Sequence, residues 1–337
     1  MKRNMKEWVA EVIAAQVKKP MPLLSFPCIS LMDITVSELI ADSEAQARGL
    51  KAVADRVSAG AAVSLMDLSV EAECFGSEIR LSGDEVPTVV GAVITDMDEA
   101  QAMEVPEVGS CRTGIYIDAI AKAAQMITDR PVFAGVIGPY SLAGRLLDVS
   151  EAMMLCYDDP DMVHEVLGKC TQFIINYCRA YKEAGANGVA IAEPLAGLIS
   201  PALAAEFSHP YIKQIVDAVQ DDSFAVIYHN CGNYVAMMTE ELFKVGAMGY
   251  HFGDMISMTE VLPKAPADVL IMGNVSPANQ FKNGTPESMR EETQRIMRDC
   301  CGYPNFVISS GCDIPPLSPW ENTDAFFAAA ADFYKNI

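Results

Sequence analysis

Short apolar runs rich in β-branched residues recur along the chain and alternate with longer segments of helical periodicity. The runs that we expect to form strands are residues 22–29, 61–66, 132–138, 188–193, 224–229, 248–252, 268–273 and 305–310. Segment 159–185 is typical of the intervening helices, because its apolar residues recur at helical spacing. Continuous apolar strands that alternate with helices predict a parallel sheet covered on both faces. Eight such units indicate an α/β fold, a single (β/α)8 TIM barrel.

Two additions to this barrel are expected. Residues 1–20 carry apolar side chains at helical spacing and predict an amphipathic N-terminal helix. Residues 74–95 contain Gly76, an SGDE sequence and Pro87, and predict a β-hairpin inserted after the second strand. No linker or repeat divides the chain, so we expect one domain over residues 1–337. A doubly wound dinucleotide-binding sheet is the alternative, but no G-x-G-x-x-G motif follows any expected strand.

Charge and cysteine content restrict the possible partners and compartment. The chain has 24 basic and 45 acidic residues, a formal charge of −21, which argues against binding to nucleic acid or an anionic membrane. Glu7 and Glu11 interrupt the first apolar segment, so we expect no export signal, and no apolar run is long enough to span a membrane. Ten scattered cysteines without a C-x-x-C motif fit a reducing, cytoplasmic compartment.

Three candidate metal ligands stand where predicted strands end. His229 and Cys231 close the fifth strand, and Cys312 follows the eighth. The active site of such a barrel lies at the carboxyl ends of its strands, so the three side chains should share one face. Ligands drawn from two distant strand ends, with an open fourth position, are typical of catalytic rather than structural zinc. The alternative is a chance H-x-C pair whose cysteine is an inert buried thiol.

The ligand types narrow the chemistry. Two thiolates and one imidazole cancel the charge of Zn²⁺, so the ion would ionise water poorly compared with a site of three histidines. Such an ion can instead bind a substrate thiol and hold it as the thiolate at cell pH. We therefore expect alkylation of a thiol rather than hydrolysis. Alcohol dehydrogenases also use Cys₂His zinc, but the missing nucleotide motif counts against that reaction.

A carboxylate is the expected fourth ligand, and two candidates remain open. Asp254 follows the sixth strand and Glu193 ends the fourth. Either side chain can reach the centre of the barrel mouth, or can merely cap the next helix. We favour Asp254, because the sixth strand should neighbour the fifth. His251 is expected to be a hydrogen-bonded residue inside the barrel rather than a ligand.

Five motifs resemble those of the uroporphyrinogen decarboxylase superfamily. They are "YHNCG", "SSGCDIPP", "MGNVSP" (272–277), "GPYSLAGRL" (138–146) and "SLMDLSVEAECFG" (64–76). Over nearly its whole length the chain is similar to the corrinoid-dependent branch, the methylcobamide:coenzyme M methyltransferases. That resemblance implies a (β/α)8 barrel with zinc on His229, Cys231 and Cys312.

The same resemblance implies a reaction and its partners. A methyl group would move from a methylated corrinoid (methylcobamide), carried on a small corrinoid protein, to a small-molecule thiol such as coenzyme M. Asp67 and Tyr140, after the second and third strands, are candidate contacts to the thiol or the corrinoid. A helix cap for Asp67 and a buried aromatic for Tyr140 are equally open alternatives.

Two other functions are alternatives. A uroporphyrinogen decarboxylase binds a tetrapyrrole with eight carboxylates and should be rich in arginine at its cleft. The arginine motif of that family, R-Q-A-G-R, has no match here, and residues 26–40 at the equivalent place contain no basic residue. The second alternative is a barrel without catalytic activity that only docks a corrinoid protein.

Overall fold

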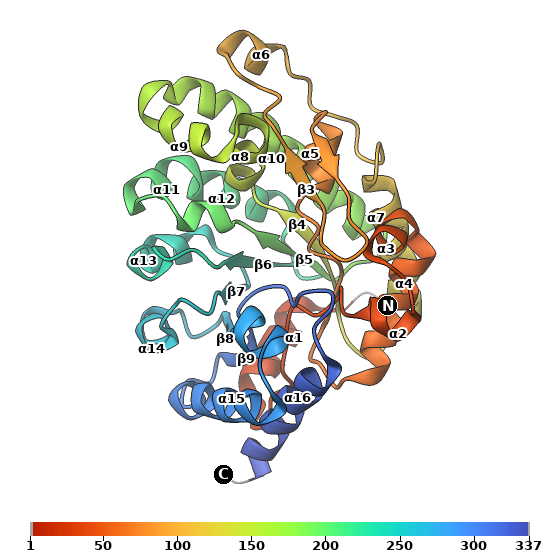
Figure 1. Ribbon diagram of the computed structural model, residues 1–337. Helices are drawn as coiled ribbons and strands as arrows, with labels where there is room; N and C mark the ends of the chain where they lie inside the picture. The colour runs from red at the N-terminus through yellow and green to blue at the C-terminus, as the bar shows by residue number, and fades with distance from the viewer. Residues whose placement is uncertain (1–2, 336–337) are drawn as a thin grey trace.

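A seven-stranded parallel sheet forms the centre of the computed structural model, which describes residues 3–335. Its strands, in sheet order, are β1 (Ala62–Val63), β4 (Val132–Ile137), β5 (Gly188–Ala192), β6 (Ala225–Asn230), β7 (Gly249–Phe252), β8 (Leu270–Val275) and β9 (Phe306–Ser310). All neighbouring strands are parallel, as the sequence predicted. Figure 1 shows the helices following the sheet in chain order, from α8, α9 and α10 at the top to α15 and α16 at the bottom.

Most helices connect the strands and cover the outside of the sheet. The α-helices are α1 (Met5–Ala14), α2 (Cys28–Met32), α3 (Val36–Ala41), α4 (Ser43–Arg56), α5 (Val70–Cys74), α6 (Met97–Ala102), α7 (Thr113–Met126), α8 (Pro139–Leu147), α9 (Val149–Asp158), α10 (Pro160–Glu183), α11 (Pro201–Phe207), α12 (His209–Val219), α13 (Thr239–Leu242), α14 (Met258–Val261), α15 (Pro286–Cys300) and α16 (Trp320–Lys335). Shorter helical turns are η1 (Pro194–Gly197), η2 (Val235–Met237), η3 (Phe243–Val245), η4 (Leu262–Lys264) and the π-helical η5 (Pro277–Lys282). Within the described chain, no helix combines the length and apolar character needed to cross a membrane.

The first expected strand, residues 22–29, does not form, so the described chain has seven parallel strands in its main sheet instead of the eight expected for a (β/α)8 barrel. Residues 20–25 belong to no helix or strand, and α2 begins at Cys28. The segment still lies between β9 and the start of β1, because Met21 N donates to Ile308 O (3.1 Å) and Gly60 N donates to Pro20 O (2.9 Å). Pro20 and Pro22 have no N–H to give to a ladder, which explains why this position in the sheet holds only isolated hydrogen bonds.

Strand residues alternate between two apolar clusters, one on each face of the sheet. In β6, Ala225 and Ile227 face the inner cluster, whereas Val226 and Tyr228 face the outer cluster beneath the helices. Helix α1 joins the inner cluster through Met5 and Val9, and Trp8 packs against Phe133 of β4 with ring centroids 5.8 Å apart. The amphipathic N-terminal helix therefore covers the inner core at the end of the sheet where the strands begin.

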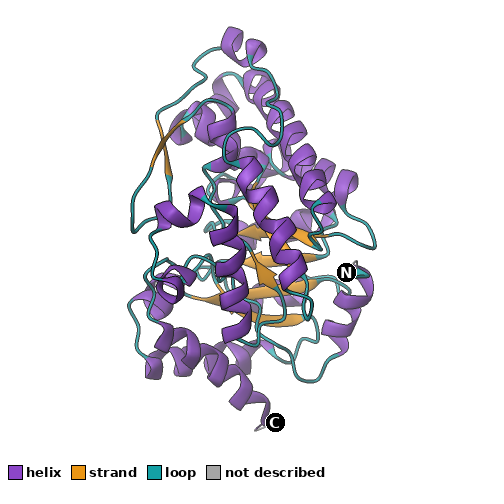
Figure 2. Cartoon of the chain, turned by 90° about the vertical axis from the view of Figure 1, so that its right-hand side faces the viewer, coloured by secondary structure: helices purple, strands orange, loops and turns teal. Residues whose placement is uncertain are grey.

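An antiparallel pair, β2 (Glu78–Arg80) and β3 (Thr88–Val90), lies in the segment for which the sequence suggested a hairpin. Figure 2 shows this hairpin standing apart from the central sheet. The chain after it is attached to α8, since Val93 N and Ile94 N both donate to Leu146 O. The hairpin thus lies over the side of the molecule where β1 and β4 end.

Candidate metal and substrate site

The carboxyl ends of strands β6 and β9 bring the three predicted metal ligands together. His229 lies near the end of β6, on the inner face that Ala225 and Ile227 begin, and Cys231 follows the strand directly. Cys312 comes two residues after β9. His229 is buried, and the two cysteines are partly exposed at the mouth.

Glycines allow the loops after β6, β7 and β9 to approach each other. A Cβ atom on Gly253 would lie 2.5 Å from Cys231 Cα, and one on Gly311 would lie 2.6 Å from Asp254 N. Real side chains do not tolerate such contacts, so these positions require glycine for reasons of space. The loop that carries Cys231 and the loop that carries Cys312 are therefore both packed against the loop after β7.

The distances among the three ligand atoms fit one metal ion. The nitrogen of His229 and the sulfurs of Cys231 and Cys312 lie within 4.8 Å of one another, and Cys312 Sγ is 3.4 Å from His229 Nε2. Around tetrahedral zinc, a sulfur ligand and a nitrogen ligand lie about 3.5 Å apart. Among the described residues, this is the one group of its kind with such spacing. The donor set and its geometry fit zinc.

A hydrogen bond links the side chains of the two cysteines. A hydrogen bond from Cys312 to Cys231 lowers the pKa of Cys231 and raises the pKa of Cys312 to about 12. Burial adds to the increase at Cys312, whereas His229 opposes it. A divalent cation at this point would displace the thiol protons, because thiolates rather than thiols bind metal.

A chain of hydrogen bonds behind His229 determines which of its nitrogens is free. The Ser309 hydroxyl donates to Met21 O (2.8 Å), so its oxygen must accept from His251 Nε2 (2.7 Å). Burial and the neighbouring His229 lower the pKa of His251 far below its usual value, so this ring is neutral and its Nδ1 is an acceptor. His229 Nδ1 therefore donates to His251 Nδ1 (2.8 Å), which leaves His229 Nε2 unprotonated and directed toward Cys312. The prediction that His251 is a hydrogen-bonded interior residue is confirmed by its burial and its two ring contacts.

The two candidate carboxylates lie in different surroundings, and neither belongs to the group of three ligands. Glu193 is fully buried, and its oxygens accept from Tyr140 N (3.1 Å) and Ser141 N (2.6 Å) at the start of α8. Glu193 does not cap the helical turn that follows it, which was the expected alternative; its carboxylate instead accepts from the first turn of α8, an earlier helix. Asp254 is exposed, its backbone touches Gly311, and its charge acts to raise the pKa of Cys231. Of the two, Asp254 is the one whose charge acts on a metal-ligand candidate.

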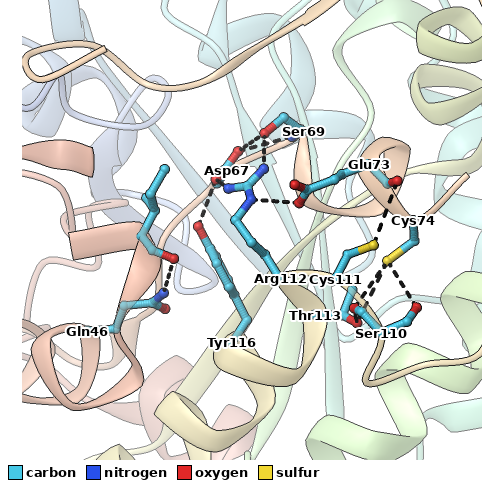
Figure 3. Close-up of polar contacts among 11 residues, drawn as sticks. Gln46, Asp67, Ser69, Glu73, Cys74, Ser110, Cys111, Arg112, Thr113 and Tyr116 are labelled. Carbon is cyan, nitrogen blue, oxygen red and sulfur yellow. Dashed lines mark hydrogen bonds and ion pairs between the residues drawn. The ribbon is translucent and has the colours of Figure 1, made fainter. Parts of the chain in front are cut away.

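Asp67 is the centre of a buried polar network, drawn in Figure 3. One carboxylate oxygen accepts from Ser69 N and Oγ, and the other accepts from Arg112 Nη1 (2.6 Å) and Tyr116 OH (2.7 Å). Arg112 also binds Glu73 Oε2 through Nε at 2.7 Å. Both oxygens of Asp67 are thus occupied by side chains of the protein, and the network ties the loop after β1 to α5 and α7.

Tyr140 lies at the start of α8 and has no exposed surface. Its hydroxyl is 3.6 Å from Cys156 Sγ of α9, and burial raises the pKa of the phenol. The side chain points into the protein interior. This placement agrees with the alternative that Tyr140 is a buried aromatic residue.

Sequence reasoning missed four residues near the mouth: Ser309, Arg112, Arg145 and Asp313. Ser309 could have been found from the alternation in β9, because it shares the inner face with Val307. Asp313 follows Cys312 directly in the quoted motif. Arg112 and Arg145 carried no signal, since their surroundings come from segments far apart in the chain.

A family model described as uroporphyrinogen decarboxylase (URO-D) matches residues 28–333. The chain belongs to this family. The family resemblance of the five motifs is thereby confirmed. A family with this fold includes proteins with different reactions, so the site must decide among them.

The relatives include both reactions considered above. A methylcobamide:CoM methyltransferase, MtbA, of Methanosarcina acetivorans is 26% identical over 272 residues, covering 79% of this chain and 78% of that protein. A uroporphyrinogen decarboxylase of Methylobacillus flagellatus is 25% identical over 287 residues, covering 82% and 79%. A solved methyltransferase from Methanosarcina mazei has a TM-score of 0.86 over 98% of this chain and 99% of that chain, at 23% identity. This last comparison supports the fold, an α/β structure of the URO-D type.

Proposed function

We propose that this chain is a cytoplasmic, zinc-dependent methyltransferase. It moves a methyl group from a methylated corrinoid (a methylcobamide) on a small corrinoid protein to a small-molecule thiol such as coenzyme M. The observation that carries the proposal is the group formed by His229, Cys231 and Cys312 at the open end of the sheet. The names of relatives such as MtbA support the same reaction class, and we treat residues 1–337 as one catalytic domain.

The donor set accounts for the choice of reaction. When bound, zinc would supply a positive centre that holds the acceptor sulfur as a thiolate near neutral pH. Two thiolates and a neutral imidazole offset the charge of the ion, which makes ionisation of water a poor reaction here. The acceptor sulfur then forms its bond to the methyl carbon, and the electron pair of the broken bond stays with the corrinoid.

The chain's own contribution is to hold the ligands ready. The contact between His251 and His229 keeps the proton of His229 on Nδ1, so Nε2 offers its lone pair without rearrangement. Gly253 and Gly311 hold the ligand loops together. Alignment of two reactants in this way can contribute several kcal/mol to the rate.

Uroporphyrinogen decarboxylation gains no support from the site. Helix α2 and the residues around it carry no arginine where that family has its arginine motif. Asp67 is already saturated by Arg112, Tyr116 and Ser69.

The test is X-ray absorption at the zinc edge of purified protein, together with methyl transfer from free methylcobalamin to coenzyme M or homocysteine. We expect two sulfur ligands, rising to three when an accepted thiol is added. Cys312→Ala should lose zinc and activity while keeping the circular dichroism of the parent. Cys301→Ala is the matched control, because this thiol lies at the end of α15, away from the mouth. Full zinc content and rate in Cys312→Ala would contradict the proposal, and methyl transfer by the wild type would exclude a barrel that only docks a partner.

A further inference from the structure

A cavity opens beside the loop that carries Cys312. It measures about 300 Å³ and is bounded by the loop after β1, residues 86–89 of the hairpin, α8 and the loop after β9. Its wall includes Asp313, the residue that follows Cys312. The volume is sufficient for a small organic molecule.

Arg145, in the last turn of α8, lines this cavity without a partner. Among residues 3–335 it makes no ion pair, and its buried Nε has no hydrogen bond. The contrast with Arg112 is clear, because that guanidinium binds the carboxylates of both Asp67 and Glu73. A half-buried guanidinium without an anion is unfavourable in free energy, because its lost hydration is not replaced. Its fork of N–H groups is suited to a carboxylate or a similar planar anion.

The carboxyl group of Asp313 lines the same cavity. Its Oδ1 is buried and has no hydrogen-bond partner in the described chain. Asp313 and Arg145 do not satisfy each other, since no ion pair within 4.0 Å joins them. One cavity therefore presents an unpaired guanidinium nitrogen and an unpaired carboxyl oxygen, the latter on the residue next to a metal-ligand candidate.

We propose that this cavity binds the zwitterionic head group of an α-amino acid thiol, with Arg145 taking its carboxylate and Asp313 its ammonium group. The proposal rests on the proposed function, which supplies the thiol acceptor, and it names the substrate class of that same site. A thiol with only a sulfonate or carboxylate would satisfy Arg145 and leave Asp313 unpaired. A neutral thiol would satisfy neither residue.

Binding of the methylated product class tests the proposal without any methyl transfer. The probes are methionine, 3-(methylthio)propionate, 2-(methylthio)ethanesulfonate and 2-(methylthio)ethanol, titrated calorimetrically into the wild type, Arg145→Gln and Asp313→Asn. Methionine should bind the wild type most tightly. Arg145→Gln should lower the affinity for methionine and for both anionic probes by about tenfold or more. Asp313→Asn should lower the affinity for methionine alone, by a similar factor.

The matched controls are Arg298→Gln and Asp299→Asn, which change the same residue types on the exposed side of α15. Arg145→Lys is a second variant that keeps the charge and loses the fork, so it should weaken methionine less than Arg145→Gln does. Zinc content and melting temperature are measured for every variant, which separates loss of the head-group contacts from loss of the fold or the metal.

The titrations test the amino acid assignment, and methyl transfer by the wild type tests the proposed function. Methionine binding no tighter than 3-(methylthio)propionate, or unchanged by Asp313→Asn, would overturn the amino acid assignment. Tighter binding of the sulfonate than of methionine would also overturn it and would point to coenzyme M. Failure of the proposed function is recognised separately, since the wild type would then methylate no thiol at all, 2-mercaptoethanol included, whatever the titrations show.

Discussion

His251 and His229 face each other through their Nδ1 atoms at 2.8 Å, and one proton lies between them. Because Ser309 accepts from the far side of His251, that proton belongs to His229. The ring that offers its Nε2 toward the two cysteines is thus held in one tautomer by residues of β7 and β9.

Removal of the Ser309 hydroxyl should weaken metal binding. In Ser309→Ala, His251 is free to change tautomer, and His229 loses its fixed proton arrangement. We expect the zinc dissociation constant to rise about tenfold or more, measured by competition with a chelator. Ser310→Ala is the control, since this neighbouring hydroxyl accepts from Leu23 N and does not contact either histidine. Equal zinc affinity in both variants would show that the chain of hydrogen bonds has no influence on the site.

Addition of one methyl group at Gly253 should separate the ligand loops. The new Cβ would lie 2.5 Å from Cys231 Cα, so Gly253→Ala must displace the cysteine or its loop. The expected result is loss of most bound zinc in a folded protein, measured by metal analysis and circular dichroism. Gly168→Ala is the opposite case, because its Cβ meets nothing within 4 Å in helix α10, and it should stabilise the protein by roughly 0.5–1 kcal/mol.

Truncation of Arg112 should destabilise the fold through Asp67. Arg112→Met leaves a buried carboxylate without its cation, which typically costs about 3–5 kcal/mol in the free energy of unfolding. Urea unfolding measures the loss. The double variant Asp67→Asn with Arg112→Met removes the charge as well, so it should be more stable than Arg112→Met alone. A double variant that is less stable than both single variants would contradict this account.

Glu71 should make stability depend on pH. Burial raises the pKa of this carboxyl to about 8, and its Oε2 has no partner, whereas Oε1 accepts from Ile137 N. Since the unfolded carboxyl ionises near its ordinary pKa, the folded state holds the extra proton between about pH 4.5 and 8, and stability is lost as pH rises through that range. Glu71→Gln removes this loss.

The measurement is urea unfolding of Glu71→Gln and the wild type at pH 5 and pH 8. Between pH 5 and pH 8, the free energy of unfolding of the variant should rise relative to that of the wild type by roughly a few kcal/mol. Glu240→Gln, on the exposed surface, should show no such gain. A constant difference between Glu71→Gln and the wild type would mean that Glu71 is ionised in the fold.

The parallel sheet and the group of three ligands could be predicted because each depends on local patterns. Apolar runs located seven of the strands, and their carboxyl ends located His229, Cys231 and Cys312 on one face. The expected strand at 22–29 was wrong because the apolar pattern says nothing of hydrogen bonds, and two prolines remove the donors.

The polar contacts of the site were less accessible to sequence reasoning. Arg112 and Asp67 are 45 residues apart, and no periodicity links them. The isolation of Arg145 is a property of three-dimensional packing, since it depends on which acidic residues fail to reach it. Such absences of partners leave no pattern in a sequence.

Helix α1 has a kinetic consequence. It covers the inner core at the end of the sheet where the strands begin. Under the proposed function, a small thiol and a bulky corrinoid protein would both approach the metal ligands from the end where the strands finish, and a docked corrinoid protein would cover the bound thiol. We therefore expect the thiol to bind first and its methylated form to leave last, an order of addition that follows from the closed floor of the sheet.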